Sequence, residues 1–274
     1  MKGLLKADFK RVFKDKLLIV MAILAVVFAL ITPLLYALLF SGTDEMVSGM
    51  VSGLVSAKAN FFSSFSVGNN LGLIAPVLLA IALCKDFSYG TVRNKIIAGK
   101  SRSAIFLSLF ITCSVIFVAV MLLHAFVTLG VSLIFFDYQQ GDFTVSDFWY
   151  FMESLALDIL TLLFVAAMLS WLCACMKNVG LVIVLYIAIS FVLVLAGSIM
   201  QMVAMVMETV GGNEKTISVL KFLDRINVGS AVTYIGTGTK YTLEDILYLT
   251  LPSTVGILGF LGLGLWRFNR KDLK

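Results

Sequence analysis

The chain of 274 residues is 60% hydrophobic and only 14% charged, with a mean hydropathy of +1.02. Soluble domains are about 45–50% apolar and about a quarter charged, so the composition excludes an ordinary soluble protein. The net charge of +5 needs no nucleic-acid partner, because lysines beside a membrane face anionic lipid.

The first 16 residues predict an amphipathic helix that lies in the membrane interface. Apolar residues recur at helical spacing on one side, and lysines repeat every four residues on another. The apolar set is Leu5, Phe9, Val12 and Phe13, and the basic set is Lys2, Lys6, Lys10 and Lys14. This division is typical of helices that bury one face in the headgroup region. The alternative is a basic flank that only sets the topology.

Six long apolar runs follow, and each is predicted to span the membrane. Lipid offers the backbone no hydrogen-bond partners, so a span is a helix or a barrel strand, and these continuous runs lack the alternation of barrel strands. The third run would be about 50 Å long against a hydrocarbon core of about 30 Å, so we expect it to bend or to project. The predicted fold is an all-α integral membrane protein with an interfacial helix at 1–16 and a six-span domain at 17–274. The predicted spans are 17–40, 67–84, 104–136, 150–175, 179–207 and 246–268.

The basic residues predict the orientation. If the N-terminus is inside, only five of the 21 Lys and Arg lie in outer loops: Lys58, Lys215, Lys221, Arg225 and Lys240. The excess of Lys and Arg in cytoplasmic segments therefore predicts that both termini are cytoplasmic.

The polar stretch between the second and third spans predicts a short helix at about 90–98. Thr91 is suited to cap its start, Val92 and Ile96 share one face, and Gly99 is suited to end it. A basic helix of two turns at this position is well shaped to press against a cytoplasmic partner. The alternative is a connecting loop whose lysines hold the topology. The residues Gly99-Lys100-Ser101 resemble the end of a Walker A loop, but Asn94 replaces its first glycine and no strand precedes it, so ATP is not expected to bind there.

The longest polar connection, from Glu208 to Asp245, is predicted to be extracellular and partly helical. Residues 217–226 carry apolar side chains at near-helical spacing. Part of this loop is therefore expected to pack on the outer interface before the last span.

Few residues could support catalysis or a metal. With His124 as the single histidine, a zinc site with two histidines is impossible, so the chain is not expected to be an enzyme. The four cysteines are expected to be small packing residues. His124 is expected to be hydrogen-bonded within the bundle.

Asp158 lies within the fourth predicted span, where an unpaired carboxylate is costly. Three roles are open for it: a structural role with Ser154 or Thr161 as partner, a place in the translocation path, or proton coupling. The candidates for the translocation path are Asp158, Ser154, Thr161 and His124.

The stretch before the third span resembles the permeases of type-2 ABC exporters. The residues that carry the resemblance are Asp86, Tyr89, Gly90, Thr91, Arg93, Asn94, Gly99, Ser101 and Arg102. The overall layout fits as well, and the chain is most similar to small permeases of Gram-positive bacteria that export amphipathic peptides or confer resistance to antimicrobial ones.

The resemblance implies a bacterial plasma-membrane transporter built from two permeases, identical or homologous, and two cytoplasmic ABC ATPases. ATP and Mg²⁺ would bind at the ATPases and none at this chain, and alternating access would move an amphipathic or hydrophobic substrate out of the cell. The short helix would be the coupling helix, and the N-terminal helix a second contact. The expected coupling residues are Asp86, Tyr89, Gly90, Thr91, Val92, Arg93, Asn94 and Ile96. The expected partners are these proteins and membrane lipid, with no nucleic acid, and the alternative function is an ATP-independent transporter or channel.

Overall fold

The computed structural model describes residues 1–40, 56–66, 70–88, 90–139, 143–176, 178–236 and 240–270. In this part of the chain all regular structure is helical and no strand occurs, which confirms the all-α class. The helices are α1 (Lys2–Val12), α2 (Lys16–Phe40), α4 (Ala57–Ser63), α5 (Asn70–Ser88), α6 (Thr91–Ile97), α7 (Arg102–Phe135), α8 (Val145–Cys175), α9 (Val179–Val210), α10 (Glu214–Arg225), α11 (Val228–Tyr234) and α12 (Leu243–Arg270).

Five of these helices are each long and apolar enough to cross a membrane: α2, α7, α8, α9 and α12. They agree with five of the predicted spans to within five residues at each end. The largest difference is at the start of α8, where Thr144 and Asp147 form a capping box ahead of the predicted start. The protein is therefore a multi-pass membrane protein.

Helix α5 is shorter than the helices of the other five predicted spans. It meets the same length and apolarity requirement only together with α6, and the two are bent by 44° at the break between them. Lys85 and Asp86 near its end leave a short apolar stretch, which is more typical of a buried or re-entrant helix than of a full span. The sixth span therefore stays a prediction. Within the bundle α5 is deeply packed, with Leu71, Ala75 and Ala80 fully buried among α2, α7, α8 and α9.

Helix α7 is one uninterrupted helix of 34 residues, about 51 Å long at 1.5 Å per residue. Its length exceeds the hydrocarbon core, as expected for this run. Near its start, α7 packs against α1 and α6.

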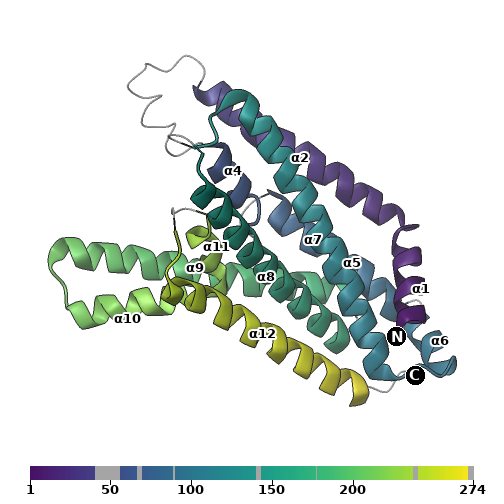
Figure 1. Ribbon diagram of the computed structural model, residues 1–274. Helices are drawn as coiled ribbons and strands as arrows, with labels where there is room; N and C mark the ends of the chain where they lie inside the picture. Colours follow the sequence, from purple (N-terminus) through teal and green to yellow (C-terminus); the bar gives the residue numbers. More distant parts are fainter. Residues whose placement is uncertain are drawn as a thin grey trace.

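The two ends of the bundle carry different elements (Figure 1). Helices α1 and α6 and the end of α12 gather at one end, which we call the terminal end. There the Arg102 guanidinium donates to the backbone carbonyl of Asn269 at 2.9 Å, which joins the start of α7 to the end of α12. Helices α4 and α11 lie at the opposite end (Figure 1), where the Ala57 N–H donates to the Asp137 carbonyl at 3.0 Å.

Helices α7 and α8 form the buried centre of the bundle, whereas few residues of α2, α9 and α12 are buried. Small residues allow close approach between neighbouring helices. A Cβ at Gly197 of α9 would overlap the Ser230 hydroxyl of α11, and a Cβ at Gly256 of α12 would overlap the Phe164 ring of α8. These glycines are therefore required by packing.

The polar connection after α9 is largely helical. Helix α9 ends at Gly211 in the left-handed conformation (φ 77°), and α10 then folds back along α9 to form a hairpin that projects from the bundle (Figure 1). An ion pair between Lys221 and Glu208 joins the two arms. The helix expected at 217–226 is confirmed, while α11 was not predicted.

Candidate functional site: an ion-pair cluster beneath the short helix α6

The N-terminal helix α1 buries an acidic side chain, that of Asp8, against the rest of the protein. It covers Lys2–Val12 inside the predicted segment, but its most buried side chains are Leu4 and Asp8, which lie one turn apart and are 6% and 1% exposed. The predicted apolar side is half-buried or exposed, as at Phe13. A fully buried acidic residue is rare unless it is paired. The residues that surround Asp8 therefore form a candidate functional site.

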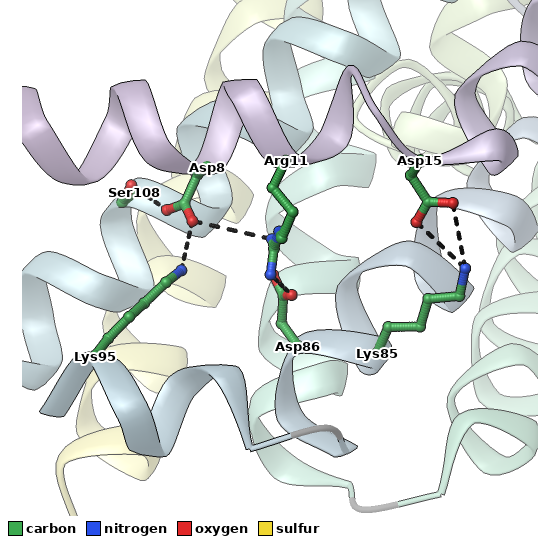
Figure 2. Close-up of polar contacts among 7 residues, drawn as sticks. All are labelled: Asp8, Arg11, Asp15, Lys85, Asp86, Lys95 and Ser108. Atoms are coloured by element: carbon green, nitrogen blue, oxygen red, sulfur yellow. Dashed lines mark hydrogen bonds and ion pairs between the residues drawn. The ribbon is translucent and has the colours of Figure 1, made fainter. Parts of the chain in front are cut away.

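The Asp8 carboxylate joins three helices (Figure 2). The Lys95 ammonium of α6 donates to Oδ1, and the Ser108 hydroxyl of α7 donates to Oδ2 at 2.6 Å. Arg11 lies one turn along α1, with a guanidinium nitrogen 3.9 Å from Oδ1. Charge-assisted hydrogen bonds of this kind are about twice as strong as neutral ones, so Asp8 fixes α1 against α6 and α7.

Two further ion pairs extend the cluster to α5 (Figure 2). The Arg11 guanidinium binds the carboxylate of Asp86, which is itself buried. The Lys85 ammonium lies 3.3 Å from the carboxylate of Asp15, in the link between α1 and α2. The backbone N–H of Leu17, together with Lys85, holds the pKa of Asp15 below its usual value, whereas burial lowers the pKa of Arg11 against the opposing effect of Asp8 and Asp15.

We call this set the ion-pair cluster: Asp8, Arg11, Asp15, Lys85, Asp86, Lys95 and Ser108 (Figure 2). Its three carboxylates and three cations balance, so it adds no net charge to the terminal end. Of these residues the sequence analysis singled out only Asp86. The one available signal was Asp8 itself, an acidic residue one turn after Leu4 in a segment otherwise rich in lysine.

Helix α6 begins and ends close to the predicted positions. Gly90 occupies the N-cap in the left-handed conformation (φ 71°), without a side-chain cap. Gly99 follows the helix at φ 78°, and its N–H donates to the Ile96 carbonyl at 2.9 Å. Glycine ends helices in this way because it adopts a positive φ without steric cost. The predicted stop at Gly99 is confirmed, but the predicted cap by Thr91 is wrong, because Thr91 is the first helical residue.

The apolar face of α6 packs on the chain itself, and its other face is open. Val92 is only 2% exposed, and Ile96 packs against the core. Arg93 and Asn94 are exposed, and Ile97 is 74% exposed. The residues free to meet another protein are therefore Arg93, Asn94 and Ile97.

The expected coupling residues divide accordingly. Asp86 and Val92 point inward, Gly90, Thr91 and Ile96 are half-buried, and Arg93 and Asn94 face outward. Tyr89 lies outside the described residues. Ile97 was not predicted, although its position one residue beyond the Val92–Ile96 face could have suggested it.

A cavity of about 270 Å³ lies beside the ion-pair cluster, between the α1–α2 link and α5. Arg11 and Asp86 line its polar side, and Met21, Leu79 and Ile116 line its apolar side. Because interiors are normally close-packed, this space marks a gap in the packing between the α1–α2 link and α5.

The candidates for the translocation path are brought into the bundle, but their partners differ from the prediction. The Ser154 hydroxyl donates to the Tyr150 carbonyl and bonds the Tyr241 hydroxyl, both at 2.8 Å. The Thr161 hydroxyl donates to the backbone carbonyl of Asp158 at 2.8 Å, not to its carboxylate. The predicted pairing of Asp158 with these two side chains is therefore wrong.

The side chains of Asp158 and His124 are both buried without a hydrogen-bond partner among the described residues. The expected hydrogen bond of His124 is thus not present in that part of the chain. Unsatisfied polar groups at such depth are rare and point to a role other than packing. They lie on α8 and α7, which are in contact.

No group of three or more His, Cys, Asp and Glu side chains suited to a metal occurs among the described residues. The sulfur atoms of Cys84 on α5 and Cys173 on α8 lie 3.2 Å apart in the buried core.

Comparison with known proteins does not decide the function. No protein-family model matches the chain, and no curated protein matches it. The geometry of the terminal end and the resemblance of the α5–α6 segment remain as the indications of function.

Proposed function

We propose that the protein is the membrane subunit of an ATP-driven ABC exporter, with α6 as its coupling helix. The observation that carries the proposal is the open face of α6. Ile97 is 74% exposed beside Arg93 and Asn94, at the same end of the bundle as α1 and the end of α12 (Figure 1). An exposed aliphatic side chain flanked by polar residues is suited to a pocket on a partner protein.

The way in which α6 is held supports a coupling role. Seven residues are too few to form a stable helix alone, yet Val92 is buried and Lys95 binds Asp8 of α1. A displacement of α6 would thus pass directly to α1, which Arg11 joins to α5. Force applied at one small surface reaches several helices of the bundle.

The partners follow from the proposal. Two cytoplasmic ATPases bind ATP and Mg²⁺, and a second permease, identical or homologous, completes the transporter. The apolar surfaces of α2, α9 and α12 are available to lipid and to that second permease. The substrate is amphipathic or hydrophobic, and the resemblance favours an antimicrobial peptide.

The test is ATP hydrolysis by the reconstituted complex. The variant Arg93→Glu/Ile97→Asp changes only exposed side chains and leaves Val92 in the core. We expect it to lose substrate-stimulated hydrolysis and to release the ATPase during purification, while membrane insertion is unchanged. The matched control is Arg267→Glu, an exposed charge reversal near the end of α12. If the double variant keeps both the stimulation and the ATPase, α6 is not the coupling element.

A second candidate, an ion-coupled transporter, is favoured by Asp158 and His124. Each is 11–13 residues from the segment that links α7 to α8, so both lie about 17–20 Å from that end along neighbouring helices at 1.5 Å per residue. Two ionisable side chains at one depth, neither with a hydrogen-bond partner in the described part of the chain, suit a proton pathway. Substrate movement driven by a pH gradient in vesicles without ATPase or ATP would favour this candidate over the exporter.

A further inference from the structure

A second cavity lies at the end of the bundle opposite to α6. Its volume is about 160 Å³, and four tyrosines line it: Tyr150, Tyr234, Tyr241 and Tyr248. They come from α8, from α11, from the segment before α12 and from α12 itself. Four separate elements thus converge on one small space, which the buried Leu249 also lines.

The tyrosine walls are fixed by contacts within the protein. The rings of Tyr150 and Tyr241 are stacked with centroids 4.7 Å apart. The Tyr241 hydroxyl accepts the Gly236 N–H at 3.0 Å, and the Tyr234 hydroxyl donates to the buried carboxylate of Asp224. Side chains held in this way form a preorganised site, since little freedom is lost when a ligand enters.

The charged groups of the cavity are mostly cationic. Arg225 and Lys240 line it together with one carboxylate, that of Asp245. The Arg225 guanidinium lies 3.6 Å from that carboxylate and over the Tyr248 ring at 6.0 Å, and both ions are partly exposed. Lys240 is exposed and makes no ion pair with any described residue. The Lys240 ammonium is therefore available to a ligand in a cavity that the tyrosines also line.

We propose that this cavity binds an oxyanion, a phosphate or a carboxylate, that is carried on a ring or another compact apolar body. Lysine and arginine bind such oxyanions by charge-assisted hydrogen bonds, and the tyrosine rings supply rigid surfaces on which a ring stacks. The volume is comparable to that of cavities of about 150 Å³ that hold benzene. The proposal does not depend on the ATPase-coupling role of α6.

The probe for the site is phenyl phosphate, with inorganic phosphate and phenol as its two halves. Titration calorimetry of the full chain in neutral detergent should show phenyl phosphate binding more tightly than either half. Lys240→Gln should weaken the binding about tenfold or more, as expected for the loss of a charge-assisted hydrogen bond. The matched control is Lys215→Gln, which changes another exposed lysine, near the start of α10, and should leave the binding unchanged.

Phenyl phosphate also distinguishes between two sources of the ligand, a phospholipid headgroup and a soluble anion. In lipid nanodiscs with an anionic phospholipid, the affinity for phenyl phosphate falls if the headgroup fills the cavity, and it is unchanged if the ligand is a soluble anion. Either result retains the site and assigns its source. The proposal is overturned if phenyl phosphate does not bind, if inorganic phosphate binds equally well, or if Lys240→Gln and Lys215→Gln have the same effect.

Discussion

Neutralising Asp8 should release α1 from the bundle. Asp8 is 1% exposed, and the Lys95 side chain that it binds is 13% exposed. Asp8→Asn preserves the shape but leaves the Lys95 charge largely uncompensated. Breaking a buried ion pair costs about 3–5 kcal/mol, and the remaining exposure of Lys95 reduces our expectation to about 2–4 kcal/mol.

The chain contains a matched control in the pair of Asp15 and Lys85. Their side chains are 31% and 36% exposed at a separation of 3.3 Å, and exposed pairs contribute about 0.2–1 kcal/mol. Asp15→Asn makes the same chemical change one turn beyond α1, so a general effect of losing a carboxylate would appear in both variants.

The assay is the modification rate of a cysteine placed at Leu4, which is buried in α1, in a chain whose native cysteines are replaced. Modification requires α1 to open, so about 2–4 kcal/mol corresponds to labelling about 30- to 700-fold faster in Asp8→Asn. Asp15→Asn should accelerate labelling by no more than about fivefold. Adding Lys95→Met to Asp8→Asn removes the stranded charge and should restore most of the protection. Equal rates in the two single variants, or no recovery with Lys95→Met, would refute the account of the cluster.

Three further predictions concern topology, packing and the buried carboxylate. A cysteine at Gly212 should react with a membrane-impermeant reagent from outside and one at Gly99 should not, and the reverse result would invert the orientation. Gly197→Ala should lower the stability by about 1–3 kcal/mol because its Cβ overlaps α11, whereas Gly130→Ala, whose Cβ meets nothing within 4 Å, should be neutral or stabilising in thermal unfolding. Asp158→Asn should leave the fold as stable or more stable, since it removes a buried carboxylate that has no hydrogen-bond partner among the residues that the structure describes, yet it should impair transport. Unchanged transport would mean that Asp158 has no place in the path.

The sequence predicts the elements whose signal is local. Apolar runs fix the long helices because the backbone in lipid must satisfy its own hydrogen bonds. The stop of α6 at Gly99 is equally local, since it depends on the conformational freedom of one residue. The sequence places a helix at 67–84, and α5 covers Asn70–Ser88, but an uncharged run does not show that Lys85 and Asp86 at the end of this helix join an ion-pair cluster.

The site itself depends on contacts between residues far apart in the chain. Asp8 contacts residues 87 and 100 positions away in the chain. Its neighbours in the sequence are mostly lysines, which favour the interpretation that it is exposed to solvent. The surface against which the apolar face of α6 packs could not be predicted either. The Val92–Ile96 face fits a partner protein and the chain's own core equally well, and only packing against the bundle decides between them. Asp158 was paired with neighbours on its own helix, but the Ser154 and Thr161 hydroxyls bond backbone carbonyls one turn away instead.

The most direct test of the proposed coupling is a photocrosslinker placed at Ile97, the most exposed apolar position of α6, in cells that express the transporter. The proposal predicts one dominant adduct, identified by mass spectrometry as a cytoplasmic ATPase with a Walker A motif, and its yield should change when ATP hydrolysis is blocked. The same crosslinker at Val92, which is buried, should give no intermolecular adduct. An Ile97 crosslinker that reaches only lipid or this chain, while the ATPase still purifies with the protein, would contradict the assignment of α6 as the coupling helix.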